Sequence, residues 1–101
     1  MALRIEYHPL ARVDYFEAIA FYAEKNKKAA LRFEEEIIRI TQLVADNPYI
    51  GKPQTNTTRS FALAHYPFKL RYAVREESIL IVSFSHTSRE PEHWKDRLEE
   101  A

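Results

Sequence analysis

The chain of 101 residues is predicted to fold as a single α+β domain over residues 1–101, in which a helical hairpin packs on a twisted antiparallel sheet. Apolar residues recur at helical spacing through the first half of the chain and alternate with polar residues in the second half. They make up 46% of the residues, enough for one core of ordinary density. The length leaves no room for a second core. The predicted element order is β-α-α-β-β-β, followed by a short C-terminal helix or turn.

The first half of the chain is predicted to be a short strand followed by two helices. Apolar residues at positions 3, 5 and 7 alternate with charged ones, as in a half-buried strand, and Pro9 suits the first turn of a helix. One apolar stripe is expected on each helix: Val13, Phe16, Ala20 and Ala23 on the first, and Phe33, Ile37, Ile40 and Val44 on the second. Tyr15, Ala18 and Tyr22 are expected to form an exposed stripe on the first helix, either a contact surface or ordinary surface.

The second half is predicted to be an antiparallel meander. Asn47-Pro48 is expected to end the second helix, and Gly51 to take a positive φ in the turn that follows. Strands are expected over residues 59–64, 68–75 and 79–84, and the last is so apolar that it reads as a central strand covered on both faces. After Pro91 a final helix or turn is expected, with Trp94 as a plug of the core.

The charge of the chain is balanced overall but unevenly distributed. Fifteen basic and fifteen acidic residues give a net charge of zero, yet no acidic residue lies between Asp46 and Glu76. That segment contains five cations, namely Lys52, Arg59, Lys69, Arg71 and Arg75. A segment that is only basic can form a positive patch on a neutral protein. The alternative is that these cations are ordinary exposed decoration of the strands.

Composition excludes several kinds of chemistry. The chain has no cysteine, so it has neither a disulfide nor a thiolate, in keeping with a reducing cytoplasm. A single glycine rules out a Gly-rich phosphate loop. The four histidines lack metal-ligand spacing, so no metal and no cofactor are expected. No segment approaches the roughly 18 apolar residues that span a bilayer, so a cytoplasmic protein is predicted.

Two groups of residues are candidates for a functional site. Lys69 and Arg71 lie on the polar side of one predicted strand and Arg59 lies on the strand before it. If these strands are neighbours, the three cations are expected to form a surface that grips phosphate or a partner's carboxylate. His86 ends the last strand, where it could exchange protons near neutral pH while Arg89 stabilises phosphate charge. The alternative is that His86 caps the strand end and bonds to the backbone.

Three segments, in this order and spacing, resemble the RelE/ParE superfamily of small bacterial toxins. They are Asn47-Pro48-Tyr49-Ile50-Gly51, the run from Tyr66 to Tyr72, and the C-terminal run in which His86 is followed by Arg89, Pro91 and Trp94. The resemblance implies the fold predicted above and a toxin of a type II toxin–antitoxin system, neutralised by a cognate antitoxin. It implies no membrane partner and no sequence-specific DNA binding by the toxin alone.

The two branches of the superfamily differ in their targets. RelE-like toxins are ribosome-dependent endoribonucleases that use basic residues on the sheet, an arginine after the last strand and often a tyrosine near the C-terminus. Here the lysine positions fall on Ser60 and Ala62, the first arginine position on Lys69, the second on Arg89 or Ser88, and the tyrosine on Trp94. ParE-like toxins use the same fold to inhibit DNA gyrase and are not nucleases.

The incomplete catalytic set favours the ParE-like branch. With a net charge of zero the chain is also poorly equipped to gain affinity from the phosphates of ribosomal RNA. An RelE-like endoribonuclease, with His86, Arg89 and Lys69 as its catalytic candidates, is the alternative, and a non-toxic binding module of the same fold is a third possibility. Whichever holds, Arg59, Lys69, Arg71 and Arg89 are the residues expected to bind the target or the antitoxin.

Overall fold

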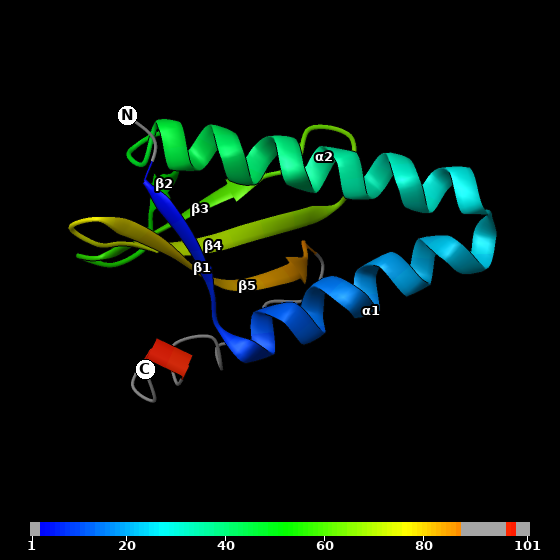
Figure 1. The fold of residues 1–101 in the computed structure, drawn as a ribbon, viewed down its shortest axis with the longest axis horizontal. Coiled ribbons are helices and arrows are strands. Elements are labelled where there is room, and N and C mark those ends of the chain that lie inside the picture. The colour runs from blue at the N-terminus through cyan, green and yellow to red at the C-terminus, as the bar shows by residue number, and fades with distance from the viewer. Residues whose placement is uncertain (1–2, 88–96, 99–101) are drawn as a thin grey trace.

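The computed structural model describes residues 3–87 and 97–98 of the chain, and two helices cover one face of a five-stranded sheet (Figure 1). The elements are β1 (Arg4–Tyr7), α1 (Pro9–Lys25), α2 (Lys27–Asp46), β2 (Lys52–Pro53), β3 (Thr58–Ala62), β4 (Phe68–Val74) and β5 (Ser78–His86). Arg97 and Leu98 are helical, in the region where a C-terminal helix is predicted. Arg89, Pro91 and Trp94 lie outside the described residues.

The sheet is mixed, so the prediction of a wholly antiparallel sheet was wrong in one strand. The strand order is β1-β5-β4-β3-β2, and β1 runs parallel to β5 whereas the other neighbours are antiparallel. No local turn joins β1 to β5, so the sequence around β1 does not encode its direction. The structure also adds β2, a two-residue edge strand. Its shortness, together with Pro53, which has no backbone N–H, blunts this edge against pairing with another chain.

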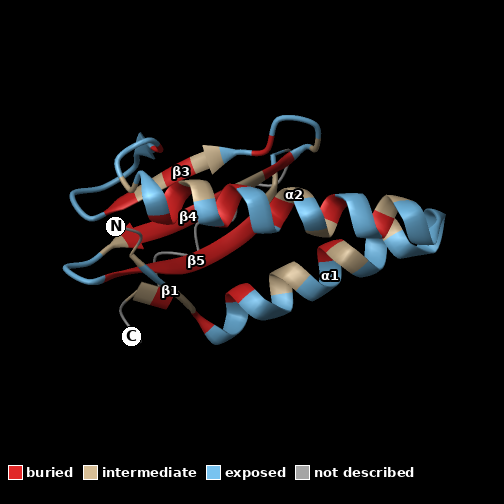
Figure 2. Cartoon of the chain, turned by 45° about the horizontal axis from the view of Figure 1, so that its top comes forward, coloured by how far each residue is buried: buried red, intermediate tan, exposed pale blue. Residues whose placement is uncertain are grey.

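The core lies between the helices and the sheet, as the buried inner sides of the elements show in Figure 2. The predicted stripe of α2 is confirmed, since Phe33, Ile37, Ile40 and Val44 are all buried. The predicted central position of the last strand is confirmed too, because β5 lies between β1 and β4. Its second face is also covered, where Leu80 and Val82 form a smaller cluster against which Leu98 packs.

The predicted faces of α1 are reversed in the structure. Val13 and Phe16 are 46% and 63% exposed, whereas Ala18 is buried. Tyr15 and Tyr22 pack against the main core, where their rings contact Phe84 and Phe33, among others. Apolar residues surround α1, so its periodicity fits either face. The tyrosines take the inner face because their large rings fill the core there, while each residue stays partly exposed.

Asn26 separates the two helices and caps both of them. Its backbone N–H donates to the Tyr22 carbonyl at 3.2 Å, which closes α1. Its side-chain Oδ1 accepts from the Ala29 N–H at 2.7 Å, which opens α2. One residue therefore reverses the chain, and Asn26 lies at the tip of a tight helical hairpin.

Beyond the end of β1, a buried ion pair completes the edge of β5. Asp14 on α1 accepts from the Phe84 N–H at 3.3 Å, and Arg97 donates to the Val82 carbonyl at 2.9 Å. The two side chains also bond to each other at 2.6 Å. Backbone groups left without a strand partner are thus satisfied by charged side chains, and the residues at 97 and 98 are held against the sheet.

Gly51 does not adopt a positive φ, so that prediction was wrong. The glycine is required by close approach instead. A Cβ at this position would lie 2.5 Å from the Tyr72 hydroxyl oxygen and 2.8 Å from the Ser60 carbonyl oxygen. The same hydroxyl accepts from the Gly51 N–H at 3.0 Å and donates to the Pro48 carbonyl at 2.8 Å. A side chain at position 51 has no room because the Tyr72 hydroxyl approaches the backbone there closely enough to bond to it.

We therefore expect Gly51→Ala to lower the free energy of unfolding by about 1–3 kcal/mol, the usual cost of overpacking. The measurement is denaturant unfolding of both proteins, combined with the same substitution in a Tyr72→Phe background. Removing the hydroxyl relieves one of the two contacts, so the glycine substitution should cost less there. Equal costs in the two backgrounds would show that the hydroxyl is not what excludes the methyl group.

Candidate functional site

Lys69 and Arg71 lie on the face of the sheet that the helices do not cover. They alternate along β4 with Leu70 and Tyr72, which belong to the main core on the helix side. The register places Lys69 opposite Ser85, and Arg71 opposite Ser83, on β5. On this face the structure therefore brings together two of the predicted cations and a row of small hydroxyl side chains.

Arg71 is a buried residue rather than an open contact. Its side chain lies within the sheet surface, 3% exposed as a residue, and its Nη1 donates to Ser85 Oγ at 3.0 Å. Lys69 is half-buried in the next row of the same face. A side chain as buried as Arg71 contributes to folding as well as to any recognition, whereas Lys69 keeps contact with solvent.

Arg59 lies on the other face of the sheet, so the three cations do not form one surface. Its Cα partner on β4 is Tyr72, which points into the main core. Its Nη1 donates to the carbonyls of Tyr49 at 3.0 Å and Gly51 at 2.8 Å, and its guanidinium lies 5.0 Å from the centre of the Tyr49 ring. β3 and β4 are neighbours, as expected, but their register places Arg59 on the face opposite to that of Lys69 and Arg71.

His86 is likewise separated from Lys69. Its Cα partner is Phe68, on the core side of β4, and its ring meets the Phe68 ring edge to face at a centroid distance of 5.3 Å. The half-buried imidazole thus lies over an aromatic ring at the end of β5, while Lys69 belongs to the opposite side of the sheet. Arg89, the third catalytic candidate, lies outside the described residues.

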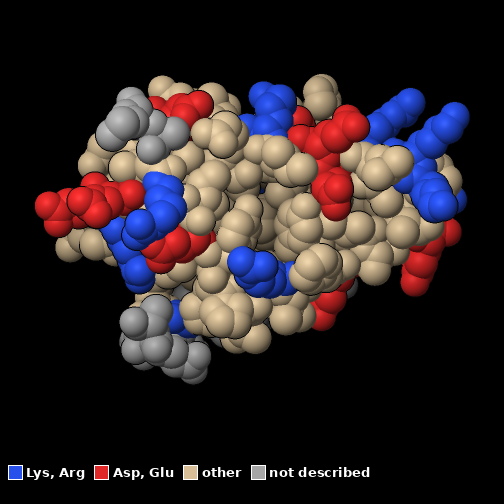
Figure 3. Space-filling model, viewed as in Figure 1, with Lys and Arg blue, Asp and Glu red and all other residues tan. Residues whose placement is uncertain are grey.

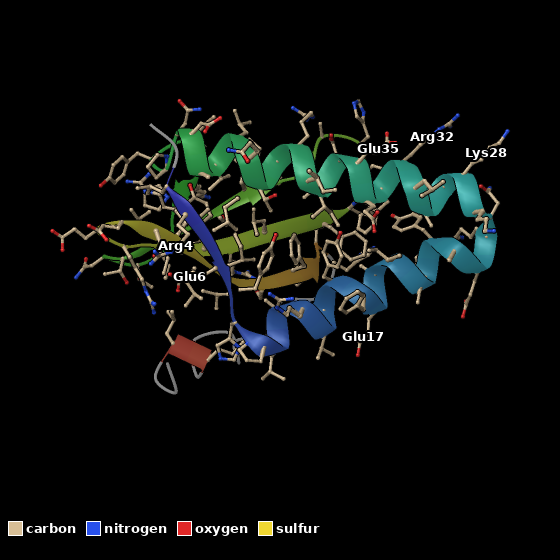
Figure 4. All side chains as sticks on the ribbon, in the orientation of Figure 1. Arg4, Glu6, Glu17, Lys28, Arg32 and Glu35 are labelled. Atoms are coloured by element: carbon tan, nitrogen blue, oxygen red, sulfur yellow. The ribbon has the colours of Figure 1, made fainter. Side chains whose placement is uncertain are left out.

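The remaining charged side chains near the helices are dispersed. Figure 3 shows basic and acidic residues interspersed on the side that the helices cover. In Figure 4, Lys28, Arg32 and Glu35 extend outward from α2, and Glu17 extends away from α1. Arg4 and Glu6 pair with each other at 3.1 Å on β1. The groups on α1 and α2 do not add to the cations on the uncovered face of the sheet. Arg4 does lie on that face, since it alternates with Ile5 and Tyr7 of the main core, and it is paired there with Glu6.

Two surface features were not recognised as sites from the sequence. The loop after α2 exposes Tyr49 and Ile50, whose exposed fractions are 70% and 46%. The outer side of α1 exposes an apolar patch of Leu10, Val13, Phe16 and Phe21, beside a hollow of ≈ 210 Å³ lined by Tyr7, Arg12, Tyr15 and Phe16. The signal for the second feature in the sequence is that apolar residues occur on every side of α1, among its charged ones, which is unusual for a helix with one free face.

Within residues 3–87 and 97–98, no three His, Cys, Asp or Glu side chains gather as a metal ion requires. Over the same ranges, no helix is both long and apolar enough to cross a membrane.

The fold matches that of known toxins. A family model described as the ParE toxin of type II toxin-antitoxin system, parDE, matches residues 5–91. A solved chain of the chromosomal ParDE TA system from P. aeruginosa has a TM-score of 0.73 and 18% identity, over 84% of this chain and 96% of that one. A mutant of the E. coli toxin RelE in the free state has a TM-score of 0.57 and 11% identity, over 99% of this chain and 97% of that one. Among curated proteins, none matches the chain.

The chain belongs to the ParE toxin family of type II toxin–antitoxin systems, since the family model covers most of its length. The predicted membership of the RelE/ParE superfamily is confirmed, and so is the predicted fold of helices packed on a sheet.

The burial of Arg71 leads to a prediction. We expect Arg71→Ala to lower the free energy of unfolding by about 1–3 kcal/mol, because it removes a buried side chain and leaves the Ser85 hydroxyl without its donor. Arg32→Ala on α2 is the matched control and should change it by no more than about 0.5 kcal/mol, since Arg32 is exposed. Thermal and denaturant unfolding measure both. If the two substitutions had equal, small effects, Arg71 would be a surface contact of the kind first expected.

Proposed function

We propose that this protein is a toxin that arrests growth by inhibiting DNA gyrase and that a cognate antitoxin neutralises it. The observation that carries the proposal is the match to the ParE toxin family over residues 5–91. The arrangement of the candidate residues supports it, because His86 and Lys69 lie on opposite sides of the sheet. General acid–base cleavage of RNA needs its proton donor, its acceptor and the phosphate within hydrogen-bond reach of one another.

The sheet surface supports the same proposal. In a nuclease of this fold the uncovered face would carry several cations in contact with RNA. Here Ser60 and Ala62 occupy the neighbouring positions on β3, opposite Arg71 and Lys69. Of these four residues, Lys69 is the one cation that is partly exposed. One such charge contributes little to binding a polyanion.

The apolar patch on α1 supports neutralisation by an antitoxin. A segment that is disordered alone can fold on binding and bury such a patch, laying apolar anchors along the helix. The hollow beside it offers aromatic walls from Tyr7, Tyr15 and Phe16. At its rim the Arg12 guanidinium stacks on the Tyr7 ring, 5.3 Å from its centre, where it could meet a carboxylate of the partner.

The proposal predicts that toxicity does not depend on RNA cleavage. After induction in bacterial cells, incorporation of a DNA precursor should fall and a DNA-damage response should appear before protein synthesis declines. Separate pulse labels for DNA, RNA and protein give the order of events, and primer extension on a reporter mRNA detects cleavage. Cells that carry the antitoxin as well serve as the control and should keep growing. Codon-periodic cuts in the reporter, with protein synthesis failing first, would replace the proposal with the ribosome-dependent endoribonuclease.

A further inference from the structure

The loop between α2 and β2 exposes two large apolar side chains from a backbone that the rest of the molecule holds in place. Tyr49 and Ile50 are 70% and 46% exposed. We call residues 47–51 the Tyr49 loop. A connection between a helix and an edge strand does not need large apolar side chains facing solvent, and turns favour small and polar residues. The turn itself therefore does not account for the large apolar side chains at positions 49 and 50.

Interactions from three directions fix the backbone of the Tyr49 loop. The Tyr72 hydroxyl bonds to Pro48 O and Gly51 N, at 2.8 and 3.0 Å. The Arg59 guanidinium donates to the carbonyls of Tyr49 and Gly51. Within the loop, the Ile50 N–H donates to the Asn47 carbonyl at 3.0 Å. A loop held this way is ordered before it meets a partner, so it loses little conformational entropy on binding.

The Tyr49 ring itself is held on one side. The Arg59 guanidinium lies 5.0 Å from its centre, which leaves the other side of the ring and the Ile50 side chain for contact. Rigid aromatic and arginine side chains at the centre of an interface are the residues that most often dominate binding energy. The loop presents the aromatic ring with an aliphatic neighbour, and Arg59 of β3 lies against that ring.

Two cations border the loop, and one acid, Asp46, directly precedes it. Lys52 is exposed directly after it, Arg59 lies beneath it, and no acidic residue occurs from position 47 to position 75. The nearest acid in sequence is Asp46, which accepts from Gln42 at the end of α2. A partner that carries carboxylates around an apolar contact would be complementary to this surface.

We propose that the Tyr49 loop is the surface by which the toxin holds its protein target, and that Tyr49 and Ile50 enter an apolar recess bordered by carboxylates. This rests on the proposed function. A projecting, preordered anchor suits a recess in a folded protein, whereas a flexible antitoxin tail suits a groove such as the hollow on α1. Nucleic acid is disfavoured because one side of the Tyr49 ring is already occupied and Ile50 can neither stack on a base nor bond to it.

The test compares a loop variant with a matched variant elsewhere. Tyr49→Ala with Ile50→Ser removes the anchor. Leu31→Ala with Ile38→Ser removes two side chains of similar exposure, 56% and 57%, from α2.

Each protein is assayed for melting temperature, copurification with the antitoxin, growth arrest, and affinity for immobilised gyrase by surface plasmon resonance. The loop variant should melt with the parent and keep the antitoxin, yet lose about tenfold or more in affinity for gyrase and fail to arrest growth. The α2 variant should behave like the parent.

A second pair of variants tests the charge. Lys52→Glu should weaken gyrase binding, most strongly at low salt, whereas Lys28→Glu at the far end of α2 should not (Figure 4). Ile50→Ser alone, a milder change, serves if the double loop variant is unstable.

Each other result overturns the inference in a recognisable way. A loop variant that keeps gyrase affinity and growth arrest shows that the loop is not the target contact, although the proposed function stands. One that arrests growth but loses the antitoxin assigns the loop to the antitoxin. If the parent itself neither binds gyrase nor arrests growth, the proposed function fails and the inference with it. If the parent cuts ribosome-bound mRNA and the loop variant does not, the loop serves nucleic acid.

Discussion

The hydroxyl of Tyr72 joins β4 to the loop between α2 and β2. Its ring lies in the main core, and its oxygen links the chain after α2 to the start of β2 through Pro48 and Gly51. Burial raises the pKa of Tyr72 above the ordinary value of a tyrosine. Its Cα partner on β3 is Arg59, which fixes the same loop from the other side. Removing the bonds at this point would free the edge of the sheet and the loop together.

The sheet separates the charged residues into groups with different tasks. On the helix side, Arg59 holds the backbone of the Tyr49 loop. On the uncovered side, Lys69 and Arg71 of β4 lie opposite serines of β5, and Arg71 is buried. Asp14 and Arg97 meet over the edge of β5, where they take the place of a missing strand. Arg59 and Arg71, two of the cations predicted to bind a target or an antitoxin, thus make contacts within the fold. We propose that the exposed apolar side chains of α1 and of the Tyr49 loop are the contacts for partners.

Sequence reasoning succeeded where one physical pattern admitted one solution. On α2 a single apolar stripe faces charged residues, and β4 and β5 carry apolar residues that only a sheet interior can cover. It failed on α1 because apolar residues surround that helix, so spacing alone cannot say which face is inside. The prediction for Gly51 was wrong because the side chain that excludes a Cβ at this position is Tyr72, which is distant in sequence. Among the site residues, Arg59 and Lys69 looked alike until the register between β3 and β4 gave them opposite faces. Pairing between distant strands decides this, and local sequence does not encode it.

We propose that this toxin acts on a protein machine and does not cut RNA. The decisive measurement is the supercoiling of relaxed plasmid by purified gyrase, followed while the toxin is titrated and the antitoxin is then added. Supercoiling should fall with the dose of toxin and return when the antitoxin is added. Full supercoiling at a large excess of folded toxin, from a preparation that arrests growth in cells, would contradict it.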